Sequence, residues 1–377
     1  MLLATAVVRN AAVASLAEYR PSAAAEFWAS HPAVEISSAM TAIAQNARVA
    51  HPPPASTFRM MADAAAKDPL APEPYLVRGV QAQTAGNGAA AQSAFEAAQW
   101  RDPRSLPAAY FLADRYFRIG DARRGLSEVA ALARLSPNGA AIMAPYLAAY
   151  GRDPANWPAL RSLFAANPEL ATPALVALAS DVATVPAVLA LAGSPAASGQ
   201  ASWLPRLLVT LTTAGQYEKA RQIWARAAGV RSQELLHDAS FTDKLSPPPF
   251  NWTLTSSAVG LAERQAGGRL HVLFYGQQDG ILATQLLLLP PGKYRLSMSL
   301  AGDPSRAQAL NWSVWCDRAD SAIMSVTLDG AARGREFWVP SGCPAQWLKL
   351  SGSSGEISQQ VDVTMAGLRL ERVRSGA

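Results

Sequence analysis

The chain has 377 residues, of which 50% are hydrophobic and 16% are charged, and this balance excludes a disordered protein. Its length exceeds what one hydrophobic core usually organises, so about two domains are expected. The net charge of +5 comes without any dense basic run, since residues such as Arg101, Arg115 and Arg124 are scattered. The charge pattern therefore argues against nucleic-acid binding.

The chain begins with an apolar stretch, MLLATAVVRNAAVASLAEYR, which carries Arg9 in its middle. It has no basic leading region and too few uninterrupted apolar residues to span a bilayer. Two interpretations stay open: the remnant of a signal or anchor helix, and a helix packed within the fold. Residues 22–66 also have a helical composition, interrupted at residues 51–54 by His-Pro-Pro-Pro.

Residues 72–105 align with residues 106–139 at a period of about 34 residues. In this alignment Gly86-Asn87 overlies Gly120-Asp121, and Pro103 overlies Pro137. A third copy fits 201–234. Gly79 and Ala113 occupy the same small-residue position in the first two copies. The second helix of the first copy contains Ala91, Phe95 and Ala98, and the third copy contains Gly215, Tyr217, Ala220, Trp224 and Ala227.

These positions resemble the tetratricopeptide repeat, in which small residues lie where two helices touch and a Gly-containing turn joins them. The resemblance implies an α-solenoid over residues 1–240 whose continuous face binds a protein partner. Individual aromatic residues such as Tyr110 are expected to be packing residues. Between residues 140 and 200 the pattern breaks into short helices because of prolines at 145, 154, 158, 168, 173, 186 and 195.

A Pro-rich linker at 241–249 precedes a region that alternates apolar and polar residues. Short alternating segments with Gly, Pro, Asp and Ser between them predict an antiparallel β-sandwich or jelly roll over 250–377. The fold class is therefore α plus all-β, in two domains. The expected strands are 250–256, 258–265, 269–276, 281–289, 292–301, 311–317, 322–328, 335–340, 345–351 and 359–373, the last broken near Gly367.

Three tryptophans, Trp315, Trp338 and Trp347, lie on the polar phase of their strands, whereas Trp252 and Tyr294 lie on the apolar phase and are expected in the core. An indole bordered by planar polar groups suits the stacking of a sugar ring. The tryptophans equally suit a face that packs on the helices or on another protein. The polar residues that we assign to a carbohydrate site are Asn311, Asp317, Glu336, Lys349 and Arg295.

The β region contains FNWTL, GGRLHVLFYG, TQLLLLPPGKYRLSMSL, QWLKLSG and VDVTMAGLRLERV. These segments resemble the jelly-roll carbohydrate-binding modules of the galactose-binding-like superfamily over about residues 245–373. The resemblance rests on a strand of Gln and aliphatic residues, a Pro-Gly turn and a Tyr-containing strand. It implies a sugar-binding sandwich. A structural calcium near Asp362 would fit such modules, but no loop with calcium-ligand spacing supports it.

Both cysteines of the chain, Cys316 and Cys343, fall in the β region. A disulfide is favoured over two buried thiols, because small β-sandwiches in oxidising compartments use such bonds. No nucleophile elbow, zinc motif or phosphate loop occurs, and the histidines lack metal-ligand spacing. Asp317 and Glu336 could form a glycosidase-like pair, but isolated acidic residues on strands are more often solvated surface residues. No catalysis, cofactor or metal is therefore expected.

Together these features predict a non-catalytic scaffold that binds a protein through its helices and a polysaccharide through its sandwich. The architecture resembles bacterial proteins of surface-polysaccharide assembly or export, which implies a periplasmic or membrane-associated location; a cytoplasmic location stays open. The alternative is an assembly factor that binds only proteins.

Overall fold

The structure is a computed structural model that describes residues 2–193, 201–231, 234–301, 306–356 and 359–373. It confirms the predicted fold class, because helices occupy the first part of the chain and two antiparallel sheets the last part. By compactness the chain divides into unit 1, Met1–Met143 with Arg161–Leu170, and unit 2, Ala144–Leu160 with Ala171–Ala377. Unit 2 therefore contains both helices and the sandwich. The predicted break at Pro195 lies outside the described residues.

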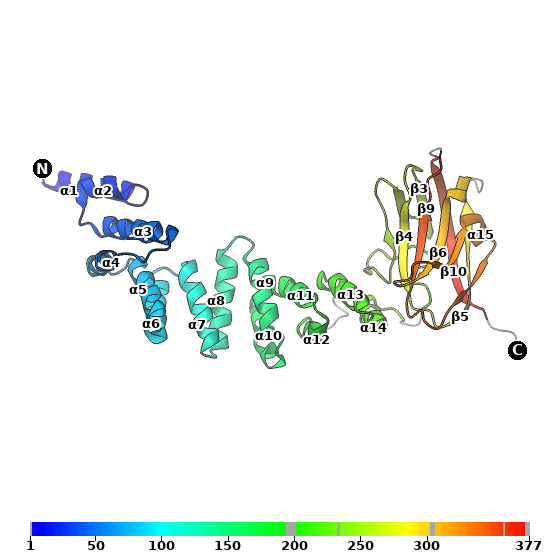
Figure 1. Cartoon of the computed structure of the whole chain (residues 1–377), viewed down its shortest axis with the longest axis horizontal. Coiled ribbons are helices and arrows are strands. Elements are labelled where there is room, and N and C mark those ends of the chain that lie inside the picture. Colours follow the sequence, from blue (N-terminus) through cyan, green and yellow to red (C-terminus); the bar gives the residue numbers. More distant parts are fainter. Residues whose placement is uncertain (1, 194–200, 232–233, 302–305, 357–358, 374–377) are drawn as a thin grey trace. The chain divides into compact units, whose positions relative to one another are not determined.

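The helical part consists of short helices that follow one another along the chain (Figure 1). None of the described helices is both long and apolar enough to cross a membrane. Their bounds are α1 Leu2–Leu16, α2 Pro21–Trp28, α3 Pro32–Arg48, α4 Ala55–Lys67, α5 Glu73–Thr84, α6 Gly88–Arg101, α7 Leu106–Arg118, α8 Ala122–Leu135, α9 Gly139–Tyr150, η1 Pro154–Asn156, α10 Trp157–Ala166, α11 Pro168–Leu178, η2 Val182–Thr184, α12 Val185–Leu191, α13 Trp203–Thr213 and α14 Tyr217–Ala228.

Each aligned repeat window holds two helices. The geometry of the turn between them accounts for the residue types found there. Gly86 and Gly120 follow α5 and α7 with φ of 75° and 80°, a left-handed conformation that glycine adopts at little cost. The next residue caps the following helix: Asn87 accepts a hydrogen bond from the Ala90 amide and Asp121 from the Arg124 amide, both at 3.1 Å. The Gly-Asn and Gly-Asp pairs thus end one helix and begin another.

Small residues let the helices approach each other. An added Cβ at Gly79 in α5 would lie 2.6 Å from the Phe95 ring of α6, so only glycine fits opposite that ring. Phe95 also stacks on Phe111 of α7, with ring centroids 4.5 Å apart. The helices α5 to α8 lie side by side in chain order (Figure 1), and the stack of Phe95 on Phe111 joins α6 to α7.

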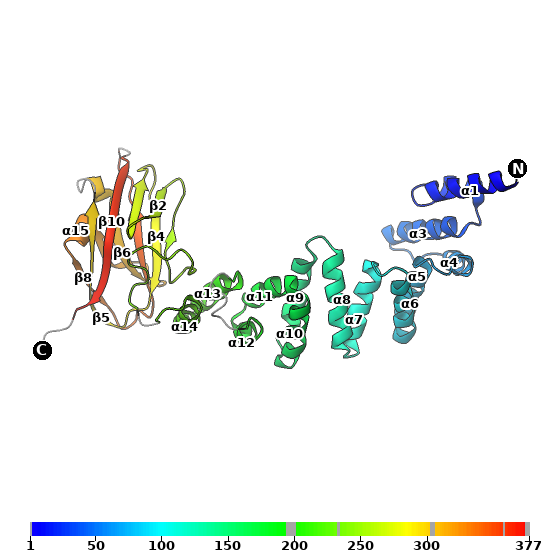
Figure 2. The ribbon, with the colours of Figure 1, turned by 180° about the vertical axis from the view of Figure 1, so that it is seen from behind.

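The sandwich contains two five-stranded antiparallel sheets. We call them sheet A, in the order β1-β4-β9-β6-β7, and sheet B, in the order β2-β3-β10-β5-β8. In Figure 2, β10 lies between β2 and β8, the two edge strands of sheet B. The bounds are β1 Thr253–Leu254, β2 Gly260–Gln265, β3 Arg269–Phe274, β4 Gly280–Leu287, β5 Gly292–Ala301, β6 Leu310–Cys316, β7 Ala322–Thr327, β8 Arg335–Val339, β9 Gln346–Gly352 and β10 Val361–Arg372.

A strand is present at each of the ten predicted places, but the first, predicted over 250–256, is only Thr253–Leu254, and two further places differ. Gly367 does not break β10; the strand continues through an irregular register between Ala366 and Arg369, where Gly367 takes a φ of 58°. Residues 328–332 form a short helix, α15 (Leu328–Ala332), which the alternation did not indicate. Thr327 caps α15 by accepting a hydrogen bond from the Gly330 amide.

The sandwich core lies between the two sheets, and it is built from the apolar phases of their strands. Trp252, Tyr294 and Trp312 are at most 3% exposed, as expected for the core. Sheet separation in such sandwiches is about 10 Å, so polar residues on the outer faces of sheets A and B cannot reach across to each other.

Candidate binding faces

The outer face of sheet A carries rows of residues that strand register sets side by side. Its aromatic row pairs Trp347 of β9 with Leu286 of β4 and with Trp315 of β6, which in turn pairs with Ala322 of β7. Two further rows cross the same strands and are mainly polar. They consist of Thr284, Lys349, Ser313 and Ser325, and of Ile281, Ser351, Asn311 and Thr327.

The two tryptophans of this face are half-buried, and their polar edges are engaged. The Trp315 indole N–H donates to the Ser313 hydroxyl at 2.9 Å, and the Lys349 ammonium lies 5.0 Å from the centre of the Trp315 ring. The Trp347 indole N–H donates to the Asp317 carboxylate at 2.9 Å. Indoles fixed in this way present a rigid apolar surface next to hydroxyl and amide groups, which is a suitable surface for a sugar ring.

Asp317 has a second role that the sequence did not reveal. Its other carboxylate oxygen accepts a hydrogen bond from the Tyr217 hydroxyl at the start of α14. Burial and this hydrogen bond to Asp317 raise the pKa of Tyr217 to about 12. The adjacent Arg318 donates to the Thr213 carbonyl at the end of α13. Asp317 and Trp347 therefore lie where the last helix pair meets sheet A.

Asp317 is also held close to the disulfide. Cys316 and Cys343 are bonded, with their Cα atoms 5.3 Å apart, which is the pairing that the sequence favours. The Asp317 amide donates to the Ala345 carbonyl at 2.9 Å. The disulfide thus ties the end of β6 to the segment that leads into β9.

The eight residues assigned to one carbohydrate site do not form one surface. Asn311, Trp315, Asp317, Trp347 and Lys349 belong to or follow strands of sheet A, whereas Trp338, Glu336 and Arg295 lie on sheet B. The prediction of a single site is therefore wrong. All three tryptophans do lie on the outward phase, but alternation along a strand says which side chains face outward and not which sheet each strand joins.

The same division separates the two carboxylates of the glycosidase-like pair. Asp317 is taken up by Tyr217 and Trp347 on sheet A, and Glu336 pairs with Lys293 and Arg295 on sheet B. Because the core lies between the sheets, these carboxylates do not flank one ligand in the way that glycoside hydrolysis requires.

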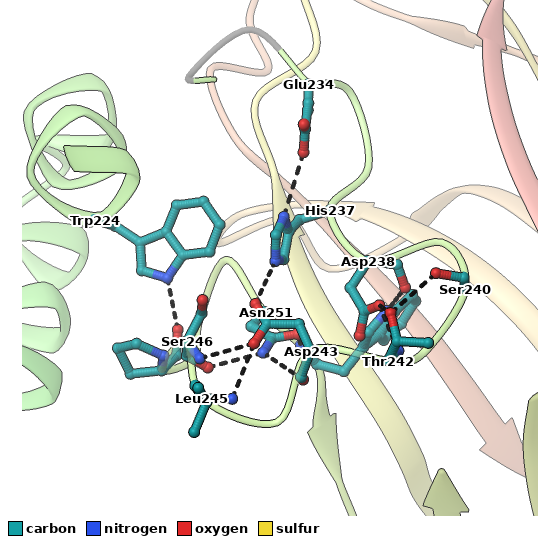
Figure 3. Close-up of polar contacts among 12 residues, drawn as sticks. Trp224, Glu234, His237, Asp238, Ser240, Thr242, Asp243, Leu245, Ser246 and Asn251 are labelled. Atoms are coloured by element: carbon teal, nitrogen blue, oxygen red, sulfur yellow. Dashed lines mark hydrogen bonds and ion pairs between the residues drawn. The ribbon is translucent and has the colours of Figure 1, made fainter. Parts of the chain in front are cut away.

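Residues 241–249, predicted as a Pro-rich linker, belong to a polar cluster that also includes Glu234 and His237 (Figure 3). His237 lies between two carboxylates: Nδ1 is 3.3 Å from Glu234 and Nε2 is 2.8 Å from Asp243. Asp243 also accepts hydrogen bonds from the Leu245 and Ser246 amides. Although burial opposes it, hydrogen bonds from Ser246 and His237 hold the pKa of Asp243 well below its usual range.

This cluster is continuous with α14. Trp224 is fully buried; its N–H donates to the Pro247 carbonyl at 2.8 Å, and its ring lies edge-on to His237 with centroids 4.8 Å apart. Arg221 packs over the rings of Trp224 and Phe250. The sequence offered one signal: the last helix of a repeat array should present a polar outer face, and α14 instead carries large aromatic residues.

Among the described residues, no group of three or more His, Cys, Asp and Glu side chains could hold a metal ion. The carboxylate of Asp362, considered as a calcium ligand, lies 2.9 Å from His271 Nε2.

Unit 1 contains an apolar groove of about 780 Å³ between α3, α4 and α5. Met40 and Val80 on its walls are 40% and 45% exposed. A volume of this size is typical of ligand and peptide pockets. The apolar residues that line it include Met40, Ile43, Phe58, Leu76, Val77 and Val80.

The sequence matches no protein-family model and no curated protein. Among solved structures, it is similar to the crystal structure of accessory secretory protein 1, 2 and 3 in Streptococcus pneumoniae, with 13% identity and a TM-score of 0.25. That similarity covers 32% of this chain and 90% of the other. A similarity this low indicates neither function nor partner, so residue chemistry alone supports the proposals below.

Proposed function

We propose that this protein is a non-catalytic adaptor that binds a protein partner through its helices and a polysaccharide through the outer face of sheet A. In this proposal the helices are tetratricopeptide-like repeats and the sandwich is a carbohydrate-binding module. The adaptor would act in the assembly or export of a surface polysaccharide.

The observation that carries the carbohydrate half is the in-register pair Trp315 and Trp347. Neighbouring strands place paired side chains about 5 Å apart at their Cβ atoms, so the two indoles arise from adjacent positions on this face; Trp315 extends toward Ser313 and Trp347 toward Asp317. Asn311 and Lys349 lie in the adjacent rows and supply hydrogen-bond donors and acceptors to sugar hydroxyls. Apolar surface with a few directional polar groups is the usual composition of a ligand site.

The protein half is supported by the groove of unit 1, whose walls leave Met40 and Val80 partly exposed. Repeat arrays commonly bind an extended or helical peptide segment along such a surface. Replacing Val80 with Glu would place a charge in the groove and weaken partner binding, while Arg104→Glu, on a loop outside the groove, is the matched control.

The cellular location in this proposal is the bacterial periplasm or envelope. The Cys316–Cys343 disulfide supports an oxidising compartment, because such bonds persist there and are rare in the cytosol. Alkylation of free thiols in protein taken directly from cells tests this, and two modified cysteines would argue for a reducing compartment.

A second candidate function, protein assembly without glycan binding, is favoured by one observation. Trp347 and Asp317 already serve the contact with Tyr217 of α14, so part of this face is structural. In that case the aromatic row stabilises the junction and no sugar reaches it.

Titration of the full chain with a panel of bacterial polysaccharides, followed by tryptophan fluorescence, separates the two candidates. We expect saturable binding that falls at least about tenfold, equivalent to about 1.4 kcal/mol, in Asn311→Ala and Trp315→Ala. Trp100→Ala, which removes a 72% exposed tryptophan in α6, is the control and should leave binding unchanged. Absence of binding across the panel would favour the assembly function.

A further inference from the structure

Trp338 in β8 lies on the outer face of sheet B with 60% of its surface exposed. The neighbouring strand β5 pairs Lys293 with Trp338 and Arg295 with Glu336. A tryptophan this exposed next to charged side chains differs from the other strand tryptophans, which are buried or half-buried. A single exposed aromatic residue is common at a protein surface, so the charged side chains around Trp338 are what make this position a candidate binding site.

The charges beside Trp338 are unevenly matched. The Lys293 ammonium lies 2.6 Å from one oxygen of Glu336, and the Arg295 guanidinium lies 3.4 Å from the other. One carboxylate therefore serves two cations, and all three side chains are at least 35% exposed. On the next strand, β10, Glu371 lies opposite Arg295, and Arg369 lies opposite Ser297.

Counting these groups, three cations (Lys293, Arg295 and Arg369) face two carboxylates (Glu336 and Glu371). The part of the face formed by β8, β5 and the adjoining end of β10 therefore has one net positive charge and suits an anionic ligand; Glu263, Arg269, His271 and Asp362 lie further across the same face. Arg and Lys are the side chains that bind carboxylates most strongly, with Arg able to donate two parallel hydrogen bonds.

We propose that Trp338, Lys293 and Arg295 form a binding site for a saccharide that carries a carboxylate, such as a uronic acid unit. The sugar ring stacks on the exposed indole, and its carboxylate bonds to the two cations that now share Glu336. This site is separate from the one proposed on sheet A, because it lies on the opposite sheet and prefers saccharides that carry a negative charge.

A saccharide fits this face better than a protein or a membrane does. Protein interfaces have a desolvated apolar centre, and here Trp338 is the one large apolar side chain among charged neighbours on β5 and β8. Insertion into a lipid surface likewise needs several apolar side chains in one patch. One flat ring bordered by charges instead matches one sugar unit with one carboxylate.

The test measures binding of an oligogalacturonate and of a neutral galactose oligomer of the same length to the full chain. We expect the acidic oligomer to bind more tightly and to lose affinity as salt is added, because charge pairs at the surface are screened. Equal affinity for both oligomers would overturn the proposal. So would binding to vesicles of an anionic lipid together with none to the acidic oligomer.

Three variants locate the site. Trp338→Ala and the double variant Lys293→Gln, Arg295→Gln should each weaken the acidic oligomer at least about tenfold. Glu336→Gln should strengthen it, because it removes the carboxylate that competes for the two cations. Weaker binding in Glu336→Gln, or unchanged binding in Trp338→Ala, would refute the assignment. Because these side chains are exposed, unchanged unfolding curves are expected for all three.

The variants also keep this proposal distinct from the one on sheet A. Trp315→Ala should leave binding of the acidic oligomer unchanged. If Trp315→Ala abolishes that binding and Trp338→Ala does not, sheet A binds the acidic saccharide and the site on sheet B is refuted.

Discussion

The Tyr217 hydroxyl donates a hydrogen bond to Asp317, one hundred residues further along the chain, and so joins the start of α14 to the end of β6. The same carboxylate accepts from the Trp347 indole. A single acidic side chain thereby couples the last helix pair to sheet A. With the bonds from Arg318 to the Thr213 carbonyl and from Trp224 to the Pro247 carbonyl, it links α13 and α14 to the sandwich within one compact unit.

Removing this hydrogen bond should weaken the junction. We expect Tyr217→Phe to lower the free energy of unfolding of unit 2 by about 1.5–3 kcal/mol, the usual contribution of a hydrogen bond to a charged group. Urea unfolding followed by tryptophan fluorescence measures it. Tyr110→Phe, at a tyrosine that is 56% exposed in α7, is the control, and equal effects of the two substitutions would contradict the role of Tyr217.

The same contact predicts a loss of stability at alkaline pH. The pKa of Tyr217 is raised to about 12 from the ordinary value near 10, so the neutral phenol is favoured by folding. Its contribution is fully present below pH about 10 and is lost as the pH rises through about 12. Tyrosinate absorbance should show late-titrating tyrosines, because the pKa of Tyr116 is also raised to about 12, and Tyr217→Phe should have one fewer of them; identical titrations would contradict this.

The disulfide should stabilise the sandwich through the loop that it closes. Cys316 and Cys343 are 27 residues apart, and closing a loop of this length contributes about 3–4 kcal/mol in the chain-entropy account. We expect the double variant Cys316→Ser, Cys343→Ser to unfold at lower urea concentration. Reductant should shift the unfolding midpoint of the natural protein and have no effect on the variant. A midpoint that reductant leaves unchanged in both would be inconsistent with the bond.

Gly79 should resist enlargement because of its contact with Phe95. An alanine Cβ there would lie 2.6 Å from the Phe95 ring, and overpacking of this kind costs about 1–3 kcal/mol. The better helix propensity of alanine offsets up to about 1 kcal/mol. Thermal unfolding of Gly79→Ala should therefore show a net loss of stability.

Two comparisons make the Gly79 experiment specific. Gly342→Ala adds a Cβ that meets nothing within 4 Å and should leave stability unchanged. Adding Phe95→Leu to Gly79→Ala should recover part of the loss, which a double-mutant cycle measures. Additive effects of the two substitutions would show that the ring contact is not the cause.

The outer face of sheet B also contains a titrating histidine. His271 contacts Glu263 at 3.1 Å and Asp362 at 2.9 Å; burial acts to lower its pKa, but hydrogen bonds to Asp362 and Glu263 outweigh it and raise the pKa. Its contribution to stability is thus fully present below pH about 6.5 and lost as the pH rises through the higher folded pKa.

Nuclear magnetic resonance titration of the His271 ring checks this expectation. We expect a pKa above the ordinary histidine value, and a lower one in Asp362→Asn, which removes one negative partner. A pKa at or below the ordinary value in the natural protein would show that the two carboxylates do not hold the protonated ring.

Much of the local structure followed from the sequence. The Gly86-Asn87 pair and its counterpart at Gly120 ended one helix and capped the next, because left-handed backbone and N-capping are local demands. Period-two alternation likewise placed Trp252 and Tyr294 inside and Trp315, Trp338 and Trp347 outside. These features depend on residues only a few positions apart.

Only the tertiary structure decided which outward residues lie together. Trp315 and Trp347 are neighbours because β6 pairs with β9, whereas Trp338 lies in the other sheet because its strand, β8, pairs with β5. The contact between Tyr217 and Asp317 and the burial of Trp224 against the segment near Pro247 were equally hidden. Strand order and helix docking arise from contacts far apart in sequence, and local periodicity carries no information about them.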